Sequence, residues 1–150
     1  MHRVLVAVVA LLTAGSSVAS EKTDVIASVN QFIDGFNKND VKAALAACAS
    51  PAFIIDEFPP YSWQGPTACS DWANDFDAFV KQGKITEPVV KLGKPRHVDI
   101  TGERAYVVLP ATFNFKKDGK PISESGSTFT IALQKTPGGW RITAWTWSKH

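Results

Sequence analysis

Hydrophobic residues recur every three or four positions in three segments of the first half of the chain, a spacing that is typical of amphipathic helices. We expect these helices over residues 25–36, from Asp40 to Cys48, and from Thr67 or Ser70 to Gln82. Asp24 and Asp40 precede the first two helices and are suited to cap them. The apolar face of the third helix carries Trp72, Phe76, Phe79 and Val80.

The second half of the chain alternates between apolar and polar residues, which predicts β-strands. We expect strands over residues 52–58, 89–92, 96–100, 104–115, 125–135 and 140–148, of which the second and third can form one bent strand. In the last strand, alternation places Trp145 and Trp147 on one face and Trp140 on the other. A helical block followed by long antiparallel strands predicts an α+β fold with helices on one face of a curved sheet.

The first predicted strand leads into the segment that carries most of the candidate chemistry. Asp56 follows the apolar residues Ile54 and Ile55, so it is expected to be poorly solvated. A carboxyl group in apolar surroundings has a raised pKa and can act as a general base or acid near neutral pH. Asp56 is therefore our candidate catalytic residue, and a carboxylate that only caps a turn or pairs with an arginine is the alternative. Alternation places Glu57 on the opposite, solvated face.

Three aromatic residues near Asp56 are candidate substrate-binding residues: Tyr61, Trp63 and Trp72. A phenol or an indole can donate a hydrogen bond to a ligand oxygen while its ring supplies contact area. Plain packing of these rings is the alternative. Asp75 and Asn114 are added as candidates by their expected facing and polarity alone. An open pocket of several hundred Å³ around Asp56 would favour ligand binding, whereas a filled interior would favour an interaction module.

The first 19 residues resemble a secretory signal peptide. Arg3 supplies a positive charge, residues 4–12 are almost wholly apolar, and Ser17, Val18 and Ala19 are suited to cleavage. The apolar run is too short to span a bilayer, and no later run is long enough to be a membrane helix. We therefore expect cleavage near Ala19, export to the periplasm or the exterior, and one domain over residues 20–150. An uncleaved anchor is the alternative.

Export changes the interpretation of the two cysteines, Cys48 and Cys69. In an oxidising compartment two cysteines can pair, and here only one pairing exists. We expect a disulfide between them, and two small buried thiols are the alternative.

Composition and charge narrow the function classes. The chain has 150 residues, of which 45% are hydrophobic and 20% charged, which suits one globular domain with a core. A formal net charge of +2 with scattered basic residues argues against nucleic-acid binding. His97 and the terminal His150 are the only histidines after the predicted signal peptide. They are too few to favour a catalytic triad with histidine or a histidine metal cluster. With no phosphate-binding or dinucleotide motif either, the sequence predicts no cofactor and no metal.

The order of the predicted elements and three local patterns resemble the SnoaL-like branch of the nuclear transport factor 2-like superfamily, which includes polyketide cyclases and ketosteroid isomerase. The patterns are Phe36-Asn37-Lys38-Asn39-Asp40, Ile54-Ile55-Asp56-Glu57 followed by Trp63-Gln64-Gly65, and Gly139-Trp140-Arg141-Ile142 leading into Trp145-Thr146-Trp147-Ser148. The resemblance spans Asp24 to Lys149. It implies a cone-shaped antiparallel sheet wrapped around helices, with a pocket at the wide end and frequent dimerisation through the outer face. Members include enzymes and non-enzymes, so the fold does not fix the function.

These observations lead to one main hypothesis and several alternatives. The chain is expected to be an exported, cofactor-free homodimer that binds a small apolar or aromatic ligand. If it is an enzyme, the reaction is isomerisation, dehydration or aldol-type cyclisation of a carbonyl compound. Asp56 then moves the proton, and Tyr61 or Trp63 holds the developing oxyanion or the ring of the substrate. A non-catalytic ligand carrier, a protein-interaction module and a purely structural homodimer are the alternatives.

Overall fold

The computed structural model describes residues 14–150, which form three helices and seven strands. The helices are α1 (Ala14–Asn37), α2 (Val41–Ala46) and α3 (Ala68–Gln82). The strands are β1 (Cys48–Ile55), β2 (Ser62–Gly65), β3 (Ile85–Leu92), β4 (His97–Thr101), β5 (Arg104–Lys117), β6 (Lys120–Thr136) and β7 (Gly139–Ser148). Most of the predicted signal peptide, residues 1–19, lies outside the described residues. Within them, no helix is both long and apolar enough to cross a membrane.

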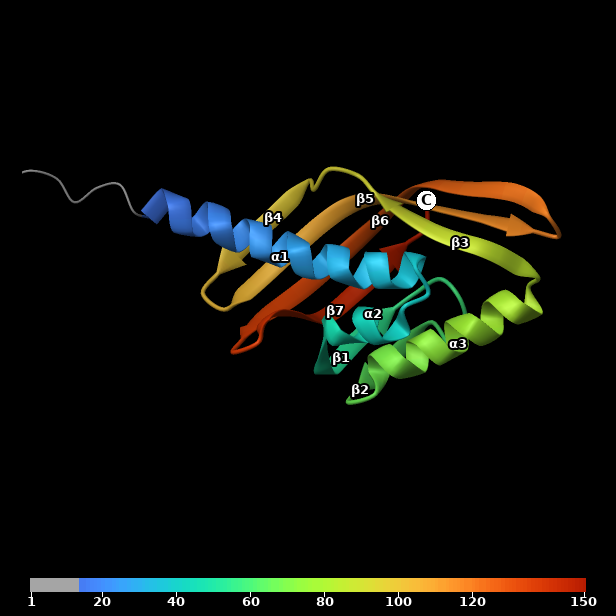
Figure 1. The fold of residues 1–150 in the computed structure, drawn as a ribbon, viewed down its shortest axis with the longest axis horizontal. Coiled ribbons are helices and arrows are strands. Elements are labelled where there is room, and N and C mark those ends of the chain that lie inside the picture. Colours follow the sequence, from blue (N-terminus) through green and yellow to red (C-terminus); the bar gives the residue numbers. More distant parts are fainter. Residues whose placement is uncertain (1–13) are drawn as a thin grey trace, which may run out of the picture.

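The strands form one curved, unclosed sheet in the order β2-β1-β7-β6-β5-β3, and β4 also pairs with β5. The helix α1 lies across one face of this sheet, and α3 lies beside β1 and β2 (Figure 1). The predicted α+β class is therefore confirmed. The sheet is mixed rather than wholly antiparallel, because β1 and β7 run parallel to each other. These two strands are joined through α3 and the rest of the sheet, and a parallel pair needs such a long crossover.

Helix α1 is longer than predicted, because it begins at Ala14 and not at Val25. Residues 16–24 contain neither proline nor glycine to interrupt it, so Asp24 lies inside the helix instead of capping it. Asp40 caps α2 as predicted, and its side chain accepts a hydrogen bond from the backbone N–H of Ala43 at 3.0 Å. The two helices pack closely at Gly35, where an added Cβ would lie 2.5 Å from the backbone nitrogen of Ala44.

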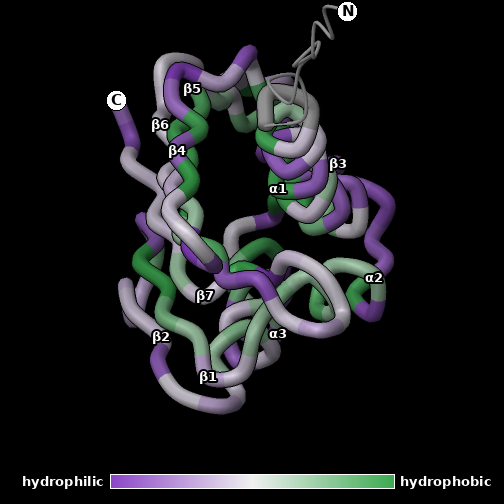
Figure 2. Tube along the Cα trace, turned by 90° about the vertical axis from the view of Figure 1, so that its left-hand side faces the viewer, coloured by the Kyte–Doolittle hydropathy of each residue, from purple (hydrophilic) through white to green (hydrophobic). Residues whose placement is uncertain are grey.

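The core lies between α1 and the covered face of the sheet. Seen along its axis, α1 lies opposite β5 and β6, with α3 and β1 below them (Figure 2). Polar contacts at Asn37 and Ser28 help to hold α1 on the sheet. The side-chain amide of Asn37 makes hydrogen bonds with both the N–H and the C=O of Val90 in β3, each at 2.8 Å. Near the middle of α1, the buried hydroxyl of Ser28 donates to the carbonyl of Trp140 at 2.9 Å.

An extra residue in β7 decides which of its side chains face the core. Ala132 of β6 is opposite Ala144, but the next residue, Leu133, is opposite Ile142, so Thr143 is unpaired in the register. Such a bulge breaks the alternation of faces. As a result Trp140, at 3% exposure, is buried in the same core as Trp145, at 4%. The prediction that Trp140 lies on the opposite face was wrong for this reason.

The predicted disulfide is present and joins the start of β1 to the start of α3. Cys48 and Cys69 are bonded, with their Cα atoms 6.7 Å apart and a separation of 21 positions in the sequence. The bond ties α3 to the sheet at the end remote from Gln82. This helix supplies one wall of the candidate site, so the disulfide helps to hold that wall in place.

Candidate functional site: an aromatic cavity with two carboxyl groups

A cavity of about 50 Å³ lies between α1, α3 and the sheet. Its lining contains two carboxyl groups, Asp56 and Glu57, two aliphatic residues, Ile33 and Val90, and ten aromatic residues. The aromatic residues are Phe32, Phe36, Phe58, Trp72, Phe76, Phe79, Phe113, Phe129, Trp145 and Trp147. The volume is well below the several hundred Å³ typical of sites for drug-sized ligands. The open pocket of several hundred Å³ that would favour ligand binding is therefore not present, and any ligand held in this cavity would have to be small.

The helices and the sheet contribute rings that pack directly against one another. From α3, Trp72 stacks on Phe76 with ring centroids 5.6 Å apart, and it meets Trp145 of β7 edge to face at 5.0 Å. From α1, Phe36 contacts Phe76 at 5.1 Å. Contacts of this kind stabilise rings in defined orientations. The cavity wall is thus one connected aromatic cluster rather than a set of separate side chains.

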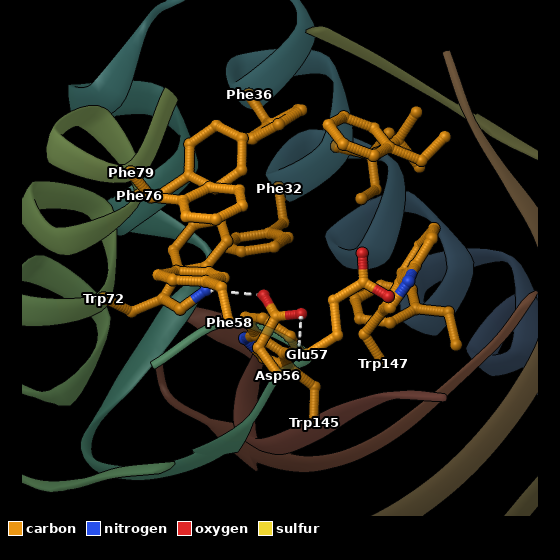
Figure 3. A pocket seen from close by; sticks show the side chains of 14 residues that line it. Phe32, Phe36, Asp56, Glu57, Phe58, Trp72, Phe76, Phe79, Trp145 and Trp147 are labelled. Atoms are coloured by element: carbon orange, nitrogen blue, oxygen red, sulfur yellow. Dashed lines mark hydrogen bonds between the residues drawn. The ribbon is translucent and has the colours of Figure 1, made fainter. Parts of the chain in front are cut away.

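A tight turn after β1 brings both carboxyl groups into the cavity. The strand ends at Ile55, and the turn is closed by hydrogen bonds from the N–H of Asp56 to the carbonyl of Tyr61 at 3.1 Å and from the N–H of Tyr61 to the carbonyl of Phe58 at 2.9 Å. Inside a turn the alternation of a strand no longer applies. Asp56 and Glu57 therefore point toward the same space, between Trp72 and Trp147 (Figure 3). The prediction that Glu57 faces away into solvent was wrong, since only 24% of its side chain is exposed.

The carboxyl group of Asp56 is held by two donors inside apolar walls. Its Oδ2 accepts a hydrogen bond from Nε1 of Trp72 at 2.8 Å, and its Oδ1 accepts one from the N–H of Glu57 at 2.7 Å. Burial raises the pKa of Asp56 from 3.8 to about 6, although both hydrogen bonds lower it by stabilising the charged form. Asp56 can therefore exchange a proton close to neutral pH.

Glu57 belongs to a cluster of charged groups at the side of the cavity. Lys149 places its Nζ 3.8 Å from the Glu57 carboxylate and 3.1 Å from that of Glu124 in β6. Burial and then repulsion from Glu124 raise the pKa of Glu57 from 4.5 to about 7, whereas Lys149 lowers it. The Oε2 atoms of Glu57 and Glu124 are both buried without a hydrogen-bond partner. One lysine thus faces two crowded carboxyl groups.

The other predicted site residues lie outside the cavity lining. Trp63 is buried at 6% exposure and donates from Nε1 to the carboxylate of Asp75 at 2.7 Å, so these two residues pair with each other. Tyr61 is 57% exposed at the turn. Asn114 lies on β5 beside a shallow open groove with Glu87. The structure therefore brings Asp56 and Trp72 together and leaves these four residues elsewhere.

Sequence reasoning missed Glu57 and left the facing of Trp145 undecided. Glu57 was missed because the alternation of β1 ends at Ile55. For Trp145, the sequence did not show which face of the last strand covers the core. A metal centre has little support from the donor set, since residues 14–150 contain no group of three or more His, Cys, Asp or Glu side chains placed to hold an ion.

A curved, open sheet around a helix, with a cavity between them, defines the nuclear transport factor 2-like class of α+β domains. The chain belongs to the SnoaL-like domain family, whose model matches residues 25–149. A nuclear transport factor 2-like protein with a cystatin-like fold from Novosphingobium aromaticivorans is similar at TM-score 0.73 and 13% identity, over 91% of this chain and 86% of that one. A superfamily member from Salmonella enterica serovar Typhimurium has the same TM-score at 18% identity, over 88% and 92%.

A ketosteroid isomerase-like protein from Erwinia carotovora atroseptica is similar at TM-score 0.67 and 15% identity, over 86% of this chain and 95% of that one. These identities show a shared fold and carry no catalytic residue over to this chain. Comparison with curated proteins gives no match.

Proposed function

We propose that this protein is an exported small-molecule-binding domain that holds its ligand in the aromatic cavity, against the carboxyl group of Asp56. One observation carries the proposal: the cavity contains an acid group with a pKa of about 6, hydrogen-bonded by Trp72 and surrounded by rings. Placing a carboxylate in apolar surroundings costs free energy, and groups perturbed in this way cluster at functional sites. A purely structural core would be more stable with an apolar residue at this position.

Native mass spectrometry of the protein purified from its own host tests the proposal. We expect a retained ligand of low mass in the wild-type protein and its loss from a Trp72→Phe variant, which removes the indole donor but keeps a ring. Asp77→Asn is the matched control, because Asp77 is an exposed α3 residue paired with Lys81. Equal ligand retention in wild type and Trp72→Phe would count against the proposal. So would the absence of ligand from every sample together with no binding of small apolar or cationic probes to the purified protein.

A second candidate function is proton transfer on a carbonyl compound, in which Asp56 is the general base. It is favoured by the pKa of about 6, which lets the group accept and return a proton near neutral pH. Trp145 lines the same cavity, and its buried Nε1 has no hydrogen-bond partner, so it is our choice of donor to a developing oxyanion. This choice replaces Tyr61 and Trp63, which lie outside the lining.

Titration of Asp56 by NMR, together with turnover of carbonyl substrates, tests the catalytic version. We expect turnover to fall by at least about a hundredfold in Asp56→Asn and to follow the ionisation of Asp56 measured by NMR. An Asp56→Asn variant that keeps full activity would show that this carboxyl group moves no proton.

Export and homodimerisation complete the proposal. The disulfide between Cys48 and Cys69 supports folding in an oxidising compartment. The outer face of β1 exposes Phe53 and Ile55, at 41% and 45%, which supports contact with a second copy. N-terminal sequencing of the secreted protein and its native mass test the two parts separately.

A further inference from the structure

We propose that the ligand of the cavity is a small organic cation, a substituted amine or quaternary ammonium group that also carries an oxygen atom. This inference rests on the proposed function, because it names the chemical class of the ligand for the same cavity. It follows from two features of the lining: carboxyl groups without a basic residue among them, and aromatic rings that attract cations.

The lining is acidic and holds no positive charge of its own. Its polar side chains are the carboxyl groups of Asp56 and Glu57 and the indoles of three tryptophans. Among the described residues no lysine, arginine or histidine forms an ion pair with Asp56, and Lys149 contacts Glu57 and Glu124 from beside the cavity. Glu57 and Glu124 thus share one ammonium group, and Asp56 has none within residues 14–150. A charge out of water is stable only when it is paired, so the site lacks a counter-ion that a cationic ligand would supply.

The aromatic walls favour the same class of ligand. The face of an aromatic ring carries partial negative charge, and a cation within about 6 Å of the ring centre is attracted to it, most strongly at tryptophan. Ten aromatic residues surround this cavity, of which three are tryptophans. Cages of aromatic rings bind quaternary ammonium ligands in this way. An anion would meet two carboxyl groups here, and a neutral apolar ligand would bury them further without pairing them.

A third observation indicates that the ligand also carries a hydrogen-bond acceptor. Trp145 is 4% exposed, lines the cavity, and its Nε1 has no hydrogen-bond partner. A buried N–H group without an acceptor costs free energy. A hydroxyl or carbonyl oxygen near the cationic head would accept this hydrogen bond. The volume of about 50 Å³ excludes a ring system, and a head group with three methyl groups enters only as the neighbouring rings move apart.

Binding of a cation must then be linked to protonation. The titratable groups that face the site are Asp56 and Glu57 from the turn after β1, Glu124 from β6 and Lys149 after β7, whereas α1, α3, β3 and β5 contribute uncharged side chains to the lining. A bound cation favours the ionised carboxyl groups, so protons are released on binding. Affinity falls as the pH drops through the pKa values of Glu57 and Asp56, about 7 and about 6.

Choline and its neutral isostere 3,3-dimethylbutan-1-ol provide the test, because they share shape and hydroxyl group and differ in charge. Binding to the full-length secreted protein is followed by calorimetry and tryptophan fluorescence at pH 8 and pH 5. We expect choline to bind at least about tenfold more tightly than the alcohol at pH 8, and this preference to fall by about tenfold at pH 5, where about nine-tenths of Asp56 is protonated. Asp56→Asn should lose the preference at both pH values, and the control Asp77→Asn should keep it.

Two outcomes would overturn the cation assignment. Equal or tighter binding of the neutral alcohol at pH 8 would refute it while leaving the proposed small-molecule site intact. Absence of binding by both compounds would also refute it, and the native mass spectrum would then decide independently whether the cavity holds another ligand.

Discussion

Replacement of Asp56 by asparagine gives the sharpest test of the site, because it removes a charge with almost no change in shape. The carboxyl group lies in apolar walls and has a pKa near 6 instead of 3.8. A raised pKa in the folded state means that the folded protein binds this proton more tightly than the unfolded chain does. Stability from Asp56 is therefore greatest when it is protonated and is lost as the pH rises through the interval from about 4 to about 6.

The size of the effect follows from the same two pKa values. A shift from 3.8 to about 6 corresponds to a penalty of at most about 3 kcal/mol when Asp56 is fully ionised. Between pH 4.5 and pH 8 the wild-type protein should lose about 2 kcal/mol of this amount. Asp56→Asn cannot lose it, since asparagine does not ionise. The variant also loses one acceptor for the two donors, Trp72 and the N–H of Glu57, but that loss does not depend on pH.

The measurement is urea unfolding of the wild type and Asp56→Asn at a series of pH values, with the difference between their unfolding free energies plotted against pH. We expect the variant to gain about 2 kcal/mol relative to wild type between pH 4.5 and pH 8. The exposed carboxylate Asp77, paired with Lys81, gives the control variant Asp77→Asn, whose plot should be nearly flat. A flat plot for Asp56→Asn would mean that Asp56 is as well solvated in the folded protein as in the unfolded chain. The reasoning about the cavity would then fail.

Three further perturbations test other parts of the structure. Replacing Cys48 and Cys69 together by alanine should lower the unfolding free energy by about 3 kcal/mol, because the disulfide closes a loop over 21 positions. The wild-type protein under reducing conditions should lose the same amount. Unchanged stability would mean that the disulfide does not form. Lys149 lowers the pKa of Glu57 and Glu124 raises it, so Lys149→Gln should raise the pKa of Glu57 measured by NMR and Glu124→Gln should lower that pKa. If both variants shifted the pKa of Glu57 in the same direction, the proposed cluster would be refuted. Trp63→Phe should lower the unfolding free energy by about 1–3 kcal/mol, because Asp75 loses its indole donor, and Asp75→Asn should lower it by less. A smaller loss of stability in Trp63→Phe than in Asp75→Asn would contradict this pairing.

Periodicity in the sequence was sufficient for most of the fold and for part of the site. Helix α3, the last three strands and the cap at Asp40 follow from local patterns that the tertiary structure keeps. The short strand β2 was not predicted, because four residues between turns carry too little pattern to recognise. Asp56 could be found because its apolar neighbours precede it directly in the chain. The volume of the cavity could not be predicted from the sequence, since it depends on how ten rings from distant segments pack together.

The two errors on facing share one physical cause. Glu57 and Trp140 were assigned by continuing the alternation of a strand past a point where the chain leaves it. For Glu57 that point is the end of β1 at Ile55, and for Trp140 it is the extra residue Thr143. The bulge at Thr143 has no strong local signal, because it is fixed by pairing with β6. The turn after β1 is closed by its own hydrogen bonds among Asp56, Phe58 and Tyr61. Bulges and turns of this kind are common beside functional sites, where they redirect side chains.

The burial of Asp56 has opposite consequences for stability and for binding, and this opposition separates a functional carboxyl group from a structural one. A structural carboxylate that pairs with a cation or caps a turn stabilises the fold in its charged form, so its removal destabilises the protein above its pKa. Asp56 has no such cation among the described residues. Its Oδ1 does accept a hydrogen bond from the N–H of Glu57 in the turn, but its pKa is raised rather than lowered. The fold therefore tolerates a charge that weakens it near neutral pH. Natural proteins keep such positions where activity requires them. A single variant that becomes more stable at pH 8 and at the same time loses its ligand would show that Asp56 serves the site and not the fold.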